Sequence, residues 1–551
     1  MNAVRILVAI AAPLALCACS HSHSNGGSAT DGKTSGDGDG GDGDGGTVSS
    51  CDPPGHFGVP TTTFTLPVTG ASISYSDVQA AFPQVDWTTL DRLYLPAGMY
   101  TSIELGNLPV RTADRPLVIT NKGGQFFVGN NPQGNFLWSF TGGSHWILTG
   151  RYDPVSETGD AAYPGHACGH YADSPGHYGI TSDDDFAFSA PYLHMGLAVG
   201  AADNFEIEYV EVERSGFAGI RLLNDPTTTD PMPNVSVHDT YVHDTGAEGY
   251  YFGWTGAPPS NKLAGLQIYN NRILRTGNEA LQIQDLGDGS HVYGNTFISG
   301  GLHWFDNGLG RYQDNNSQID IRDGSIELDH NIFIDGANTL TQFYVAPETG
   351  DGDAQVSMHD NYWSDSVDLG MYMNGMPTAT STVTFADNVF RGLVFGYGQI
   401  DPTVPTTVVG TAGTYQNPVA FTNNHWSGVP NLVPGVTGGD GSAGSFTLSG
   451  NVNADPGAIT LNDGPWQTPG HHLTAWAPNI TVNGGATPAQ YHVGDVATYG
   501  DAPTLYMATQ DSTGGSATTP GSDAADWTAL PAPSDDVRVT AGTQYAGYGV
   551  Q

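Results

Sequence analysis

Residues 268–273 read Ile-Tyr-Asn-Asn-Arg-Ile, and this short phrase decides the fold. It consists of an apolar residue, two further residues, an Asn, one more residue and a second apolar residue. The phrase returns at 292–297, 328–333, 358–363, 385–390 and 421–426. Successive Asn residues are 24 to 36 positions apart, which leaves room for a coil of three short strands in each interval. Self-similarity of this kind is typical of proteins built from stacked repeats.

The repeat resembles the right-handed parallel β-helix of the pectate-lyase-like superfamily. In that fold apolar residues on either side of a turn point into one core, and each strand pairs with its equivalents above and below. A buried Asn can satisfy the backbone groups of such a turn, because its amide both donates and accepts. We therefore expect an all-β right-handed parallel β-helix over 51–430. Its turns would carry a structural ladder of Asn271, Asn295, Asn331, Asn361, Asn388 and Asn424.

Aligning the repeats predicts further columns. Gly216, Gly246, Gly277 and Gly301 fall together, which suggests a turn with a demanding φ angle. Arg214, Asp244 and Arg275 also align, and alternating charges about 4.8 Å apart favour a ladder of salt bridges. Residues 76–85 read as a short amphipathic helix with Ser76 at its N-cap. Such a helix would cover the open end of the first coil.

The N-terminus has the features of an export signal. Arg5 precedes an apolar run over 6–16, which is too short to span a bilayer. Leu16 and Ala18 before Cys19 resemble the lipobox of bacterial lipoproteins. That resemblance implies a signal peptide over 1–18, lipidation of Cys19 and a location at the outer membrane or cell surface. An ordinary secretory signal is the alternative.

The segment after the signal has little to bury. Gly, Ser, Asp and Thr dominate 19–50, so we expect a flexible tether. Of the four cysteines, Cys17 would be removed with the signal peptide and Cys19 would carry the lipid. The remaining two, Cys51 and Cys168, would form a disulfide in an oxidising compartment. The lipid on Cys19 would be the protein's contact with a membrane.

The charge balance limits the partners. The chain has 56 acidic and 16 basic residues and a formal net charge of −40. Such a surface repels nucleic acid and anionic headgroups. It also disfavours a polyanionic glycan unless Ca²⁺, the one cofactor that composition suggests, bridges the two. No metal ligands can be named from the spacing. An extracellular polysaccharide is the expected partner, and a monomer the expected state.

The C-terminal part departs from the repeat. We expect irregular terminal coils over 431–485, a small β-module over 486–531, and a final strand and turn over 532–551 returning to the barrel end. The phrase at 491–499 resembles the opening of the chitin-binding type-3 module. That resemblance implies sugar contacts through Tyr499, Tyr506 and Trp527.

A candidate active site comes from one alignment without gaps. Residues 245–254 match 276–285, which places Glu248 over Glu279, with His303 in the same column one coil later. Carboxylates stacked about 5 Å apart suit the acid and nucleophile of a retaining glycosidase. The other candidate catalytic residues are Asp285, Asp306 and Arg221, and the candidate sugar-stacking residues are Tyr250, Tyr251, Trp254 and Trp304. Alternatively, strand parity turns both Glu side chains inward in a structural role.

These features suggest a surface protein that acts on a polysaccharide, as a glycoside hydrolase or a divergent polysaccharide lyase. The Arg-x-Pro-x-x-Arg phrase of pectate lyases is absent from the sequence, which disfavours a standard pectate lyase. A non-catalytic adhesin or glycan-binding scaffold is the alternative. The sequence names neither the sugar nor the linkage, and it leaves open whether the protein is an enzyme.

Overall fold

The computed structural model describes most of the chain from residue 57 onward. The described residues are 57, 59–67, 72–129, 136–150, 177–184, 194–223, 232–253, 262–302, 315–336, 339–345, 351–366, 369–375, 378–392, 406–411, 415–463, 473–482, 485–500, 504–513 and 519–551. The predicted signal peptide, Cys19, the tether, Cys51 and Cys168 lie outside these ranges. Among the described residues, no helix has the length and apolarity needed to cross a membrane.

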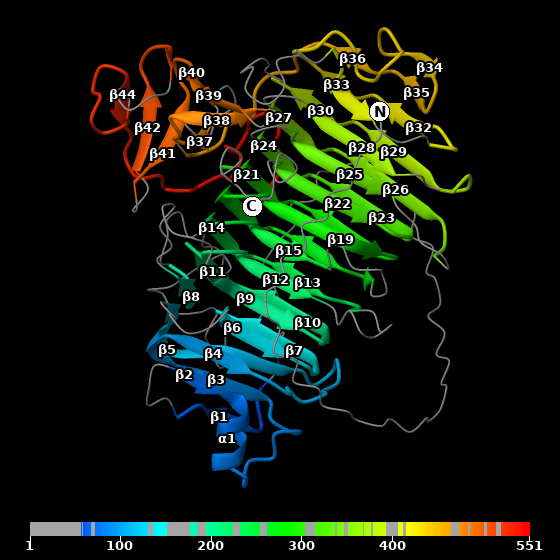
Figure 1. Cartoon of the computed structure of the whole chain (residues 1–551). Coiled ribbons are helices and arrows are strands. Elements are labelled where there is room, and N and C mark those ends of the chain that lie inside the picture. Colours follow the sequence, from blue (N-terminus) through cyan, green and yellow to red (C-terminus); the bar gives the residue numbers. More distant parts are fainter. Residues whose placement is uncertain are drawn as a thin grey trace. The chain divides into compact units, whose positions relative to one another are not determined.

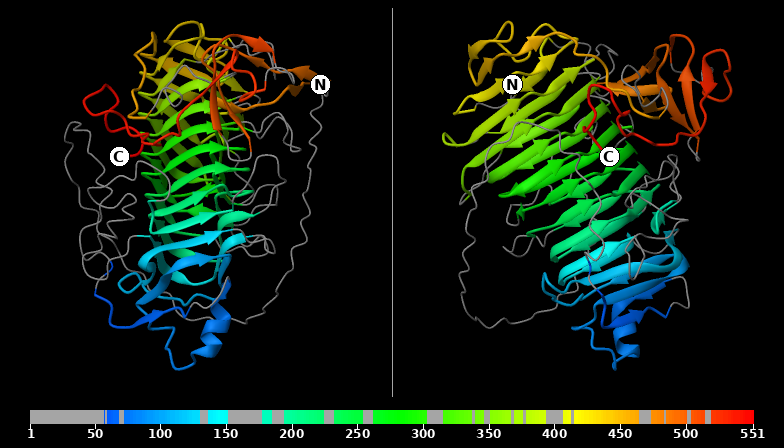
Figure 2. Two further views of the ribbon diagram at one scale, coloured as in Figure 1. Left: turned by 90° about the vertical axis from the view of Figure 1, so that its left-hand side faces the viewer. Right: turned by 180° about the vertical axis from the view of Figure 1, so that it is seen from behind.

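The strands lie in three parallel stacks, and a typical coil contributes one strand to each (Figures 1 and 2). The first and second stacks are joined in a 24-stranded sheet, and the third forms a 12-stranded sheet. Parallel strands of one sheet are connected by right-handed crossovers. The chain is therefore a right-handed parallel β-helix, which confirms the fold predicted from the repeat.

The bounds of the strands are as follows. The first stack contains β1 (Thr63–Thr65), β3 (Arg92–Tyr100), β5 (Leu117–Gly129), β7 (Ser144–Thr149), β10 (Asp203–Glu208), β13 (Ser236–His238), β17 (Gln267–Tyr269), β20 (Ser290–Tyr293), β23 (Gly324–Asp329), β26 (Ala354–His359), β29 (Thr382–Ala386), β32 (Val419–Thr422) and β35 (Phe446–Ser449), with β34 (Gly441–Ala443) antiparallel to β35. The second stack contains β8 (Ile180–Asp183), β11 (Val210–Glu213), β14 (Tyr241–Thr245), β18 (Arg272–Thr276), β21 (Thr296–Gly300), β24 (Ile332–Gly336), β27 (Tyr362–Ser366), β30 (Val389–Arg391), β33 (His425–Trp426) and β36 (Val452–Asn453). The third stack contains β2 (Ser72–Ser74), β4 (Ser102–Leu105), β6 (Phe136–Thr141), β9 (Met195–Gly200), β12 (Ile220–Leu223), β15 (Tyr250–Phe252), β19 (Leu281–Gly287), β22 (Ser317–Ile321), β25 (Thr341–Val345), β28 (Met371–Gly375) and β31 (Val409–Thr411), with β16 (Leu263–Ala264) beside β19.

The predicted Asn ladder is present at the turn between the first and second stacks. The Oδ1 atom of Asn295 accepts hydrogen bonds from the backbone N–H and Nδ2 of Asn271, at 3.1 and 2.9 Å. Its own Nδ2 donates to the carbonyl of Ile268 at 2.9 Å. The same pattern continues through all six predicted positions and extends one coil further, to Asn451. The residue before each Asn has a left-handed φ, for example 51° at Asn270.

The interior is filled by columns of apolar side chains. One column runs through Phe297, Phe333, Trp363 and Phe390, whose successive rings stack with centroids 5.1, 5.3 and 4.9 Å apart. Each of these residues is at most 1% exposed. Since inward and outward side chains alternate along a strand, the neighbours of these residues face outward. The outer faces of the stacks are therefore where sequence-specific chemistry can lie.

The corner between the second and third stacks differs from the prediction. The left-handed residues are Arg214, Asp244 and Arg275, with φ of 44°, 54° and 54°, and of the predicted glycine column only Gly301 has a positive φ. The residue with a left-handed φ thus lies two positions before the predicted glycine in each of these three coils. The predicted salt-bridge ladder is present between Arg275 and Asp244, at 2.8 Å, whereas Arg214 pairs with Asp183.

The first coil is covered by a short helix, α1 (Tyr75–Ala81). Ser76 lies inside its first turn, not at the N-cap as predicted. Val78 packs against the core, and Phe64 contacts Phe82 just after the helix at a ring distance of 5.2 Å. The helix confirms the expected cap.

The C-terminal region contains the last coils and a small β-module. Coils continue to β36, which lies within the range 431–485 assigned to irregular terminal coils. A separate four-stranded sheet contains β37 (Leu473–Ala475), β41 (Val496–Tyr499), β42 (Thr504–Ala508) and β44 (Trp527–Ala529), and two small pairs join β38 (Asn479–Val482) to β39 (Gly485–Pro488) and β40 (Gln490–Tyr491) to β43 (Ser512–Thr513). The small β-module therefore begins near residue 473, because β37 pairs with β41.

The last residues do not form the strand expected over 532–551. They form turns and one isolated bridge, Leu461 to Val539. Val537, Tyr545 and Val550 are buried against apolar side chains on the outer face of the second stack, including Leu274 and Ile332. The tail therefore covers the flank of the coils, because outward apolar residues there need to be shielded from water.

Candidate functional site

The structure confirms the alignment of Glu248 with Glu279 and shows that both side chains are buried. The N–H of Gly249 donates to the carbonyl of Glu279 at 2.9 Å, so the two Glu residues are neighbours on adjacent coils. They are 3% and 0% exposed. Burial raises the pKa of Glu248, whose Oε1 accepts a hydrogen bond from Asn278 at 3.3 Å. A glycan cannot touch either carboxylate in this conformation, so the inward structural interpretation fits their placement better.

The other predicted residues that the structure describes are not gathered in one place. Arg221 and Tyr251 are register partners on the outer face of the third stack and are half-buried. Tyr250 is fully buried in the interior, and Asp285 is buried in an ion pair with Arg322 at 3.0 Å. The predicted residues His303, Asp306, Trp254 and Trp304 lie outside the described part of the chain.

The three aromatic residues predicted to bind sugar in the small module have different surroundings. Trp527 is 3% exposed and packs edge-on to Tyr491, so it belongs to the core of the module. Tyr506 is half-buried in the same cluster. Tyr499 is 38% exposed and contacts Trp476 edge-on at 5.3 Å. Trp476, which was not predicted, is half-buried and forms an aromatic pair with Tyr499.

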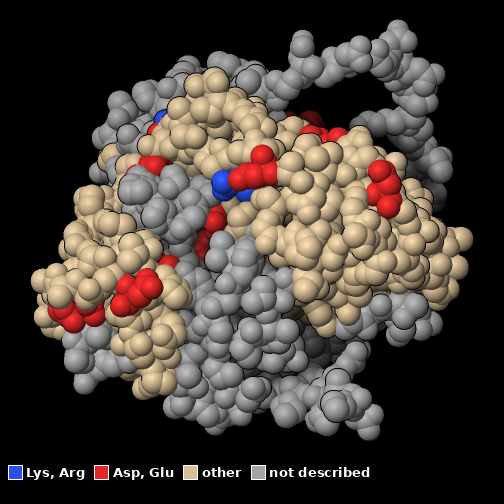
Figure 3. Space-filling view, turned by 90° about the horizontal axis from the view of Figure 1, so that it is seen from above, with Lys and Arg blue, Asp and Glu red and all other residues tan. Residues whose placement is uncertain are grey.

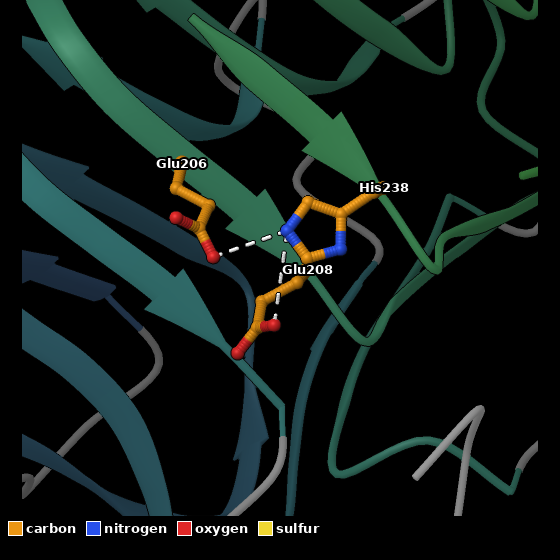
Figure 4. Close-up of side chains that lie close together, drawn as sticks. All are labelled: Glu206, Glu208 and His238. Atoms are coloured by element: carbon orange, nitrogen blue, oxygen red, sulfur yellow. Dashed lines mark hydrogen bonds and ion pairs between the residues drawn. The ribbon is translucent and has the colours of Figure 1, made fainter. Parts of the chain in front are cut away.

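A group of ionisable side chains that the sequence reasoning missed lies on the outer face of the first stack. The first of its clusters consists of Glu206 and Glu208 on β10 and His238 on β13, and we call it the His238 cluster (Figure 4). The His238 Nε2 atom lies 3.0 Å from Glu206 Oε1 and 3.9 Å from Glu208 Oε2. On the other side of the ring, Nδ1 lies 2.7 Å from Asp239 Oδ2. One imidazole is thus held between three carboxylates.

The electrostatics of this cluster favour a protonated imidazole. Burial opposes the charge, but the hydrogen bonds with Asp239 and Glu206 outweigh it and raise the pKa of His238 well above its usual range. Glu208 and His238 are almost fully buried, and only Glu206 has a partly exposed side chain, at 22%. The His238 cluster is therefore an internal ion pair with one carboxylate at the surface.

The same arrangement occurs on the other side of the turn. Glu211 and Glu213 on β11 face His243 on β14, whose Nε2 lies 3.2 and 4.0 Å from their carboxylates. His243 Nδ1 lies 2.7 Å from Asp244. Burial raises the pKa of Glu213 to about 7. We call this group the His243 cluster, and it is mostly buried like the first.

A third cluster differs because it has two imidazoles and is open. It consists of His291 on β20, Glu327 and Asp329 on β23, and His359 on β26, and we call it the two-histidine cluster. His291 Nε2 lies 2.6 Å from Asp329 Oδ1, and His359 Nε2 lies 3.0 Å from Glu327 Oε1. The four side chains are 15 to 51% exposed.

Two outward columns connect the first and third clusters along the coils. One contains Glu206, Ser236, Gln267, His291 and Glu327, and each member is the register partner of the next. In the other column, the rings of His238, Tyr269 and Tyr293 stack with centroids 4.4 and 5.0 Å apart. Because these rings cover one another's faces, they offer edges and not faces to a sugar.

A groove lies beside these columns. It has a volume of about 440 Å³, and its lining residues are Pro233, Asn234, Ser236, Ala264, Gly265, Gln267, Asp288 and Gly289. Ser236 is the register partner of Glu206, and Gln267 that of His291. The groove therefore lies between the His238 cluster and the two-histidine cluster. Its amide, hydroxyl and carboxylate groups can donate to and accept from sugar hydroxyls.

The clusters have a sequence signal that the prediction did not use. Residues 235–242 read Val-Ser-Val-His-Asp-Thr-Tyr-Val, and 356–363 read Val-Ser-Met-His-Asp-Asn-Tyr-Trp. In each case a Glu-x-Glu or Glu-x-Asp phrase precedes the His by about 30 residues, at 206–208 and 327–329. The repeat analysis placed these His-Asp pairs at turns and considered only the Asn position. The acidic residues precede each His by about the length of one coil. That spacing would have placed each His directly above its carboxylates.

Known proteins offer only weak likenesses to this chain. No family model and no curated protein matches the chain. Solved structures with a similar fold include an alginate lyase from Paenibacillus sp. str. FPU-7, at 15% identity over 58% of this chain and 94% of that one, with a TM-score of 0.38. Pectate lyase Pel9A is 10% identical over 74% and 81%, with a TM-score of 0.37. The A-module of the mannuronan C-5 epimerase AlgE4 from Azotobacter vinelandii is 13% identical over 66% and 87%, with a TM-score of 0.35. Likeness at this level says nothing about the substrate of this chain.

The buried imidazole of His243 predicts a loss of stability at alkaline pH. Burial opposes its charge, but the hydrogen bonds with Asp244 and Glu211 raise its pKa to about 10, above the value of about 6.5 that is usual for histidine. A raised pKa stabilises the fold below the unfolded value, and this contribution is lost as the pH rises through the folded value. At pH 6 we expect His243→Gln to cost roughly 1.5–3 kcal/mol, the strength of a hydrogen bond to a charged group. Urea unfolding from pH 6 to 10 should show the difference from wild type shrinking, and a constant difference would contradict this assignment.

Proposed function

We propose that this chain is an exported, lipid-anchored protein that binds an extracellular polysaccharide along the outer face of the first stack and cleaves it there. The observation that carries the proposal is the position of the groove. Its lining residues Ser236 and Gln267 are in register with ionisable side chains at both ends, Glu206 and His291. A glycan in the groove would therefore lie within one coil, about 4.8 Å, of acid and base groups.

The chemistry of the groove supports a neutral glycan or one whose charge is neutralised by a cation. Asp288 is the only charged lining residue, and it is negative. In the view of Figure 3, acidic patches are more widespread than basic ones, in line with the net charge of −40. The basic side chains near this face are engaged, since Lys262 pairs with Asp323 and Asp351, and Arg322 with Asp285. A polyanion without a bound cation would be repelled.

The reachable groups for catalysis are at the two ends of the groove. Glu206 and Glu327 have partly exposed carboxylates, and His291 and His359 have partly exposed imidazoles. Carboxylates and imidazoles are the usual general acids and bases of glycoside cleavage. Cleavage can proceed by hydrolysis or by elimination. Both release reducing ends, but only elimination creates a product that absorbs in the ultraviolet, so one assay with two readouts distinguishes them.

The proposal is tested by filling the groove. Gln267→Trp places a large side chain in it without touching the core, since Gln267 is half-buried and faces outward. In a panel of polysaccharides, wild type should release reducing ends from at least one, and Gln267→Trp should lower that rate at least about tenfold, a transition-state cost of only 1.4 kcal/mol.

The matched control uses a residue on the same outer face. Thr384→Trp adds the same side chain four coils further along the same column, away from the groove, and should keep the wild-type rate. Equal activity of Gln267→Trp and wild type would contradict the proposed site. Glycan binding that Gln267→Trp abolishes, with no release of reducing ends by wild type, would favour a non-catalytic scaffold instead.

A further inference from the structure

The two-histidine cluster differs from the other two clusters in its donor set. All three share a Glu-x-Glu or Glu-x-Asp pair below a His-Asp pair on the next coil. In this cluster a second imidazole, that of His291, approaches from the coil before. The ligand atoms of His291, Glu327 and Asp329 lie within 4.8 Å of one another. His359 adds its Nε2 at 3.0 Å from the same Glu327 carboxylate.

The orientation of both rings is fixed by groups outside the donor set. His359 Nδ1 lies 2.9 Å from Asp360 Oδ2, which leaves Nε2 directed at Glu327. A carboxylate behind a histidine is the usual arrangement for orienting a metal-binding imidazole. The ring of His291 stacks on Tyr293 at 4.1 Å, and its Nε2 faces Asp329. Both imidazoles thus present Nε2 to the Glu327 carboxylate, at 4.0 Å for His291 and 3.0 Å for His359.

The distances between donors suit a small cation. Bonds of 2.0–2.2 Å around a tetrahedral centre place neighbouring ligand atoms roughly 3.3 Å apart. The separations here are 2.6 Å from His291 to Asp329, 3.0 Å from His359 to Glu327, and 4.0 Å from His291 to Glu327. They lie on both sides of that value, and each of these three donor pairs is within about 1 Å of it.

The cluster is also accessible. Glu327 is 51% exposed, and the two imidazoles are 28 and 26% exposed. By contrast, the imidazoles of the His238 and His243 clusters are 2% exposed, and each is already enclosed by carboxylates from below and beside it. Those two clusters are therefore complete as ion pairs, whereas the third can exchange its protons for a cation from solution.

We propose that His291, Glu327, Asp329 and His359 bind a divalent transition-metal cation of the Zn²⁺ type. Two imidazole nitrogens and two carboxylates are ligands that Zn²⁺ and its neighbours accept, whereas Ca²⁺ and Mg²⁺ take oxygen ligands. The inference does not depend on the proposed glycan cleavage, because binding can be measured without any substrate. The nearest of the proposed ligands, His291, lies one coil from Gln267, at one end of the groove.

The experiment uses the full chain, stripped of metal with a chelator and dialysed against Zn²⁺. Wild type should bind one equivalent more than the double variant His291→Gln/His359→Gln, whatever other histidines contribute. With Co²⁺ as the probe, wild type should show the visible absorption of a four-coordinate ion, and the double variant should not. Asp360→Asn, which alters only the orienting carboxylate, should weaken Zn²⁺ binding about 10–100-fold.

The control is His492→Gln. His492 lies in the small β-module, its side chain is 50% exposed, and it is outside the proposed donor set. It should retain wild-type stoichiometry and an affinity within about threefold, well below the effect of losing an orienting group. Equal Zn²⁺ stoichiometry in wild type and a folded double variant would overturn the proposal, as would loss of the site in His492→Gln. Circular dichroism of each variant establishes that it is folded.

Discussion

Replacing Asn331 with alanine is expected to lower the free energy of unfolding by about 3–5 kcal/mol, because each buried group left without a partner costs roughly 1–3 kcal/mol. Asn331 Oδ1 accepts the backbone N–H of Asn295 at 3.1 Å, and its Nδ2 donates to the carbonyl of Val292 at 2.8 Å. The Asn331 side chain is fully buried, so water cannot replace it. Both partners would lose their hydrogen bond inside a dry turn. Urea unfolding followed by circular dichroism measures the change.

The control for this prediction is Thr382→Ala, at an exposed position at the start of β29. It should change stability by no more than about 0.5 kcal/mol, as is usual for surface substitutions. A loss below about 1 kcal/mol for Asn331→Ala would mean that the ladder adds little beyond one ordinary hydrogen bond. The ladder would then be a consequence of the turn and not one of its causes.

The ladder could be predicted from the sequence because its cause is local and repeated. An Asn between two apolar residues satisfies the same backbone groups in every coil, so the signal is multiplied by the number of coils. The alignment that places Glu248 above Glu279 was correct for the same reason. The direction of the two side chains was left open between an outward catalytic pair and an inward structural one, since both lie beside a corner where alternation along a strand no longer decides which side faces solvent.

The histidine clusters depend on contacts that the repeat alone does not specify. His359 contacts Glu327 diagonally, two positions away from its register partner Asp329. Predicting that contact requires the exact number of residues in each coil, and the coils differ in length. The His-Asp pairs were visible in the sequence, but they coincide with the ladder turns, so a structural explanation was already at hand.

Other contacts join parts of the chain that no repeat relates. Asp535 lies 260 positions from Arg275, yet the two form an ion pair with distances of 2.7 and 2.8 Å. Nothing in the tail resembles the coils, and its packing follows from apolar residues such as Leu274 and Ile332 that happen to face outward. The tail was expected to return to the barrel end, whereas it packs on the flank of the second stack, a position that the sequence does not specify.

The second large effect is expected at this tail. Arg275 is 3% exposed, and its guanidinium binds two carboxylates, Asp244 at 2.8 Å and Asp535 at 2.7 Å. Arg275→Ala would leave both acids buried without their main counter-charge, which typically costs about 3–5 kcal/mol. Because Asp535 anchors the segment that carries Val537, Tyr545 and Val550, we expect the tail to detach from the second stack. Limited proteolysis should then remove residues after about 531 from the variant at protease levels that leave wild type intact.

A matched surface ion pair separates this effect from the loss of any arginine. Arg391 pairs with Asp455 at 2.7 Å, but Asp455 is 49% exposed, and such a pair is worth at most about 1 kcal/mol. Arg391→Ala should therefore keep its tail resistant to protease.

Acid provides a second route to the detached tail. Burial opposes ionisation of Asp535, yet the charge of Arg275 outweighs it and lowers the pKa of Asp535. A lowered pKa stabilises the folded state above the unfolded value and ceases to do so as the pH falls through the folded one. The wild-type tail should thus become protease-sensitive in strong acid before the coils unfold, and simultaneous loss of tail and coils would show that the ion pair is not what holds the tail.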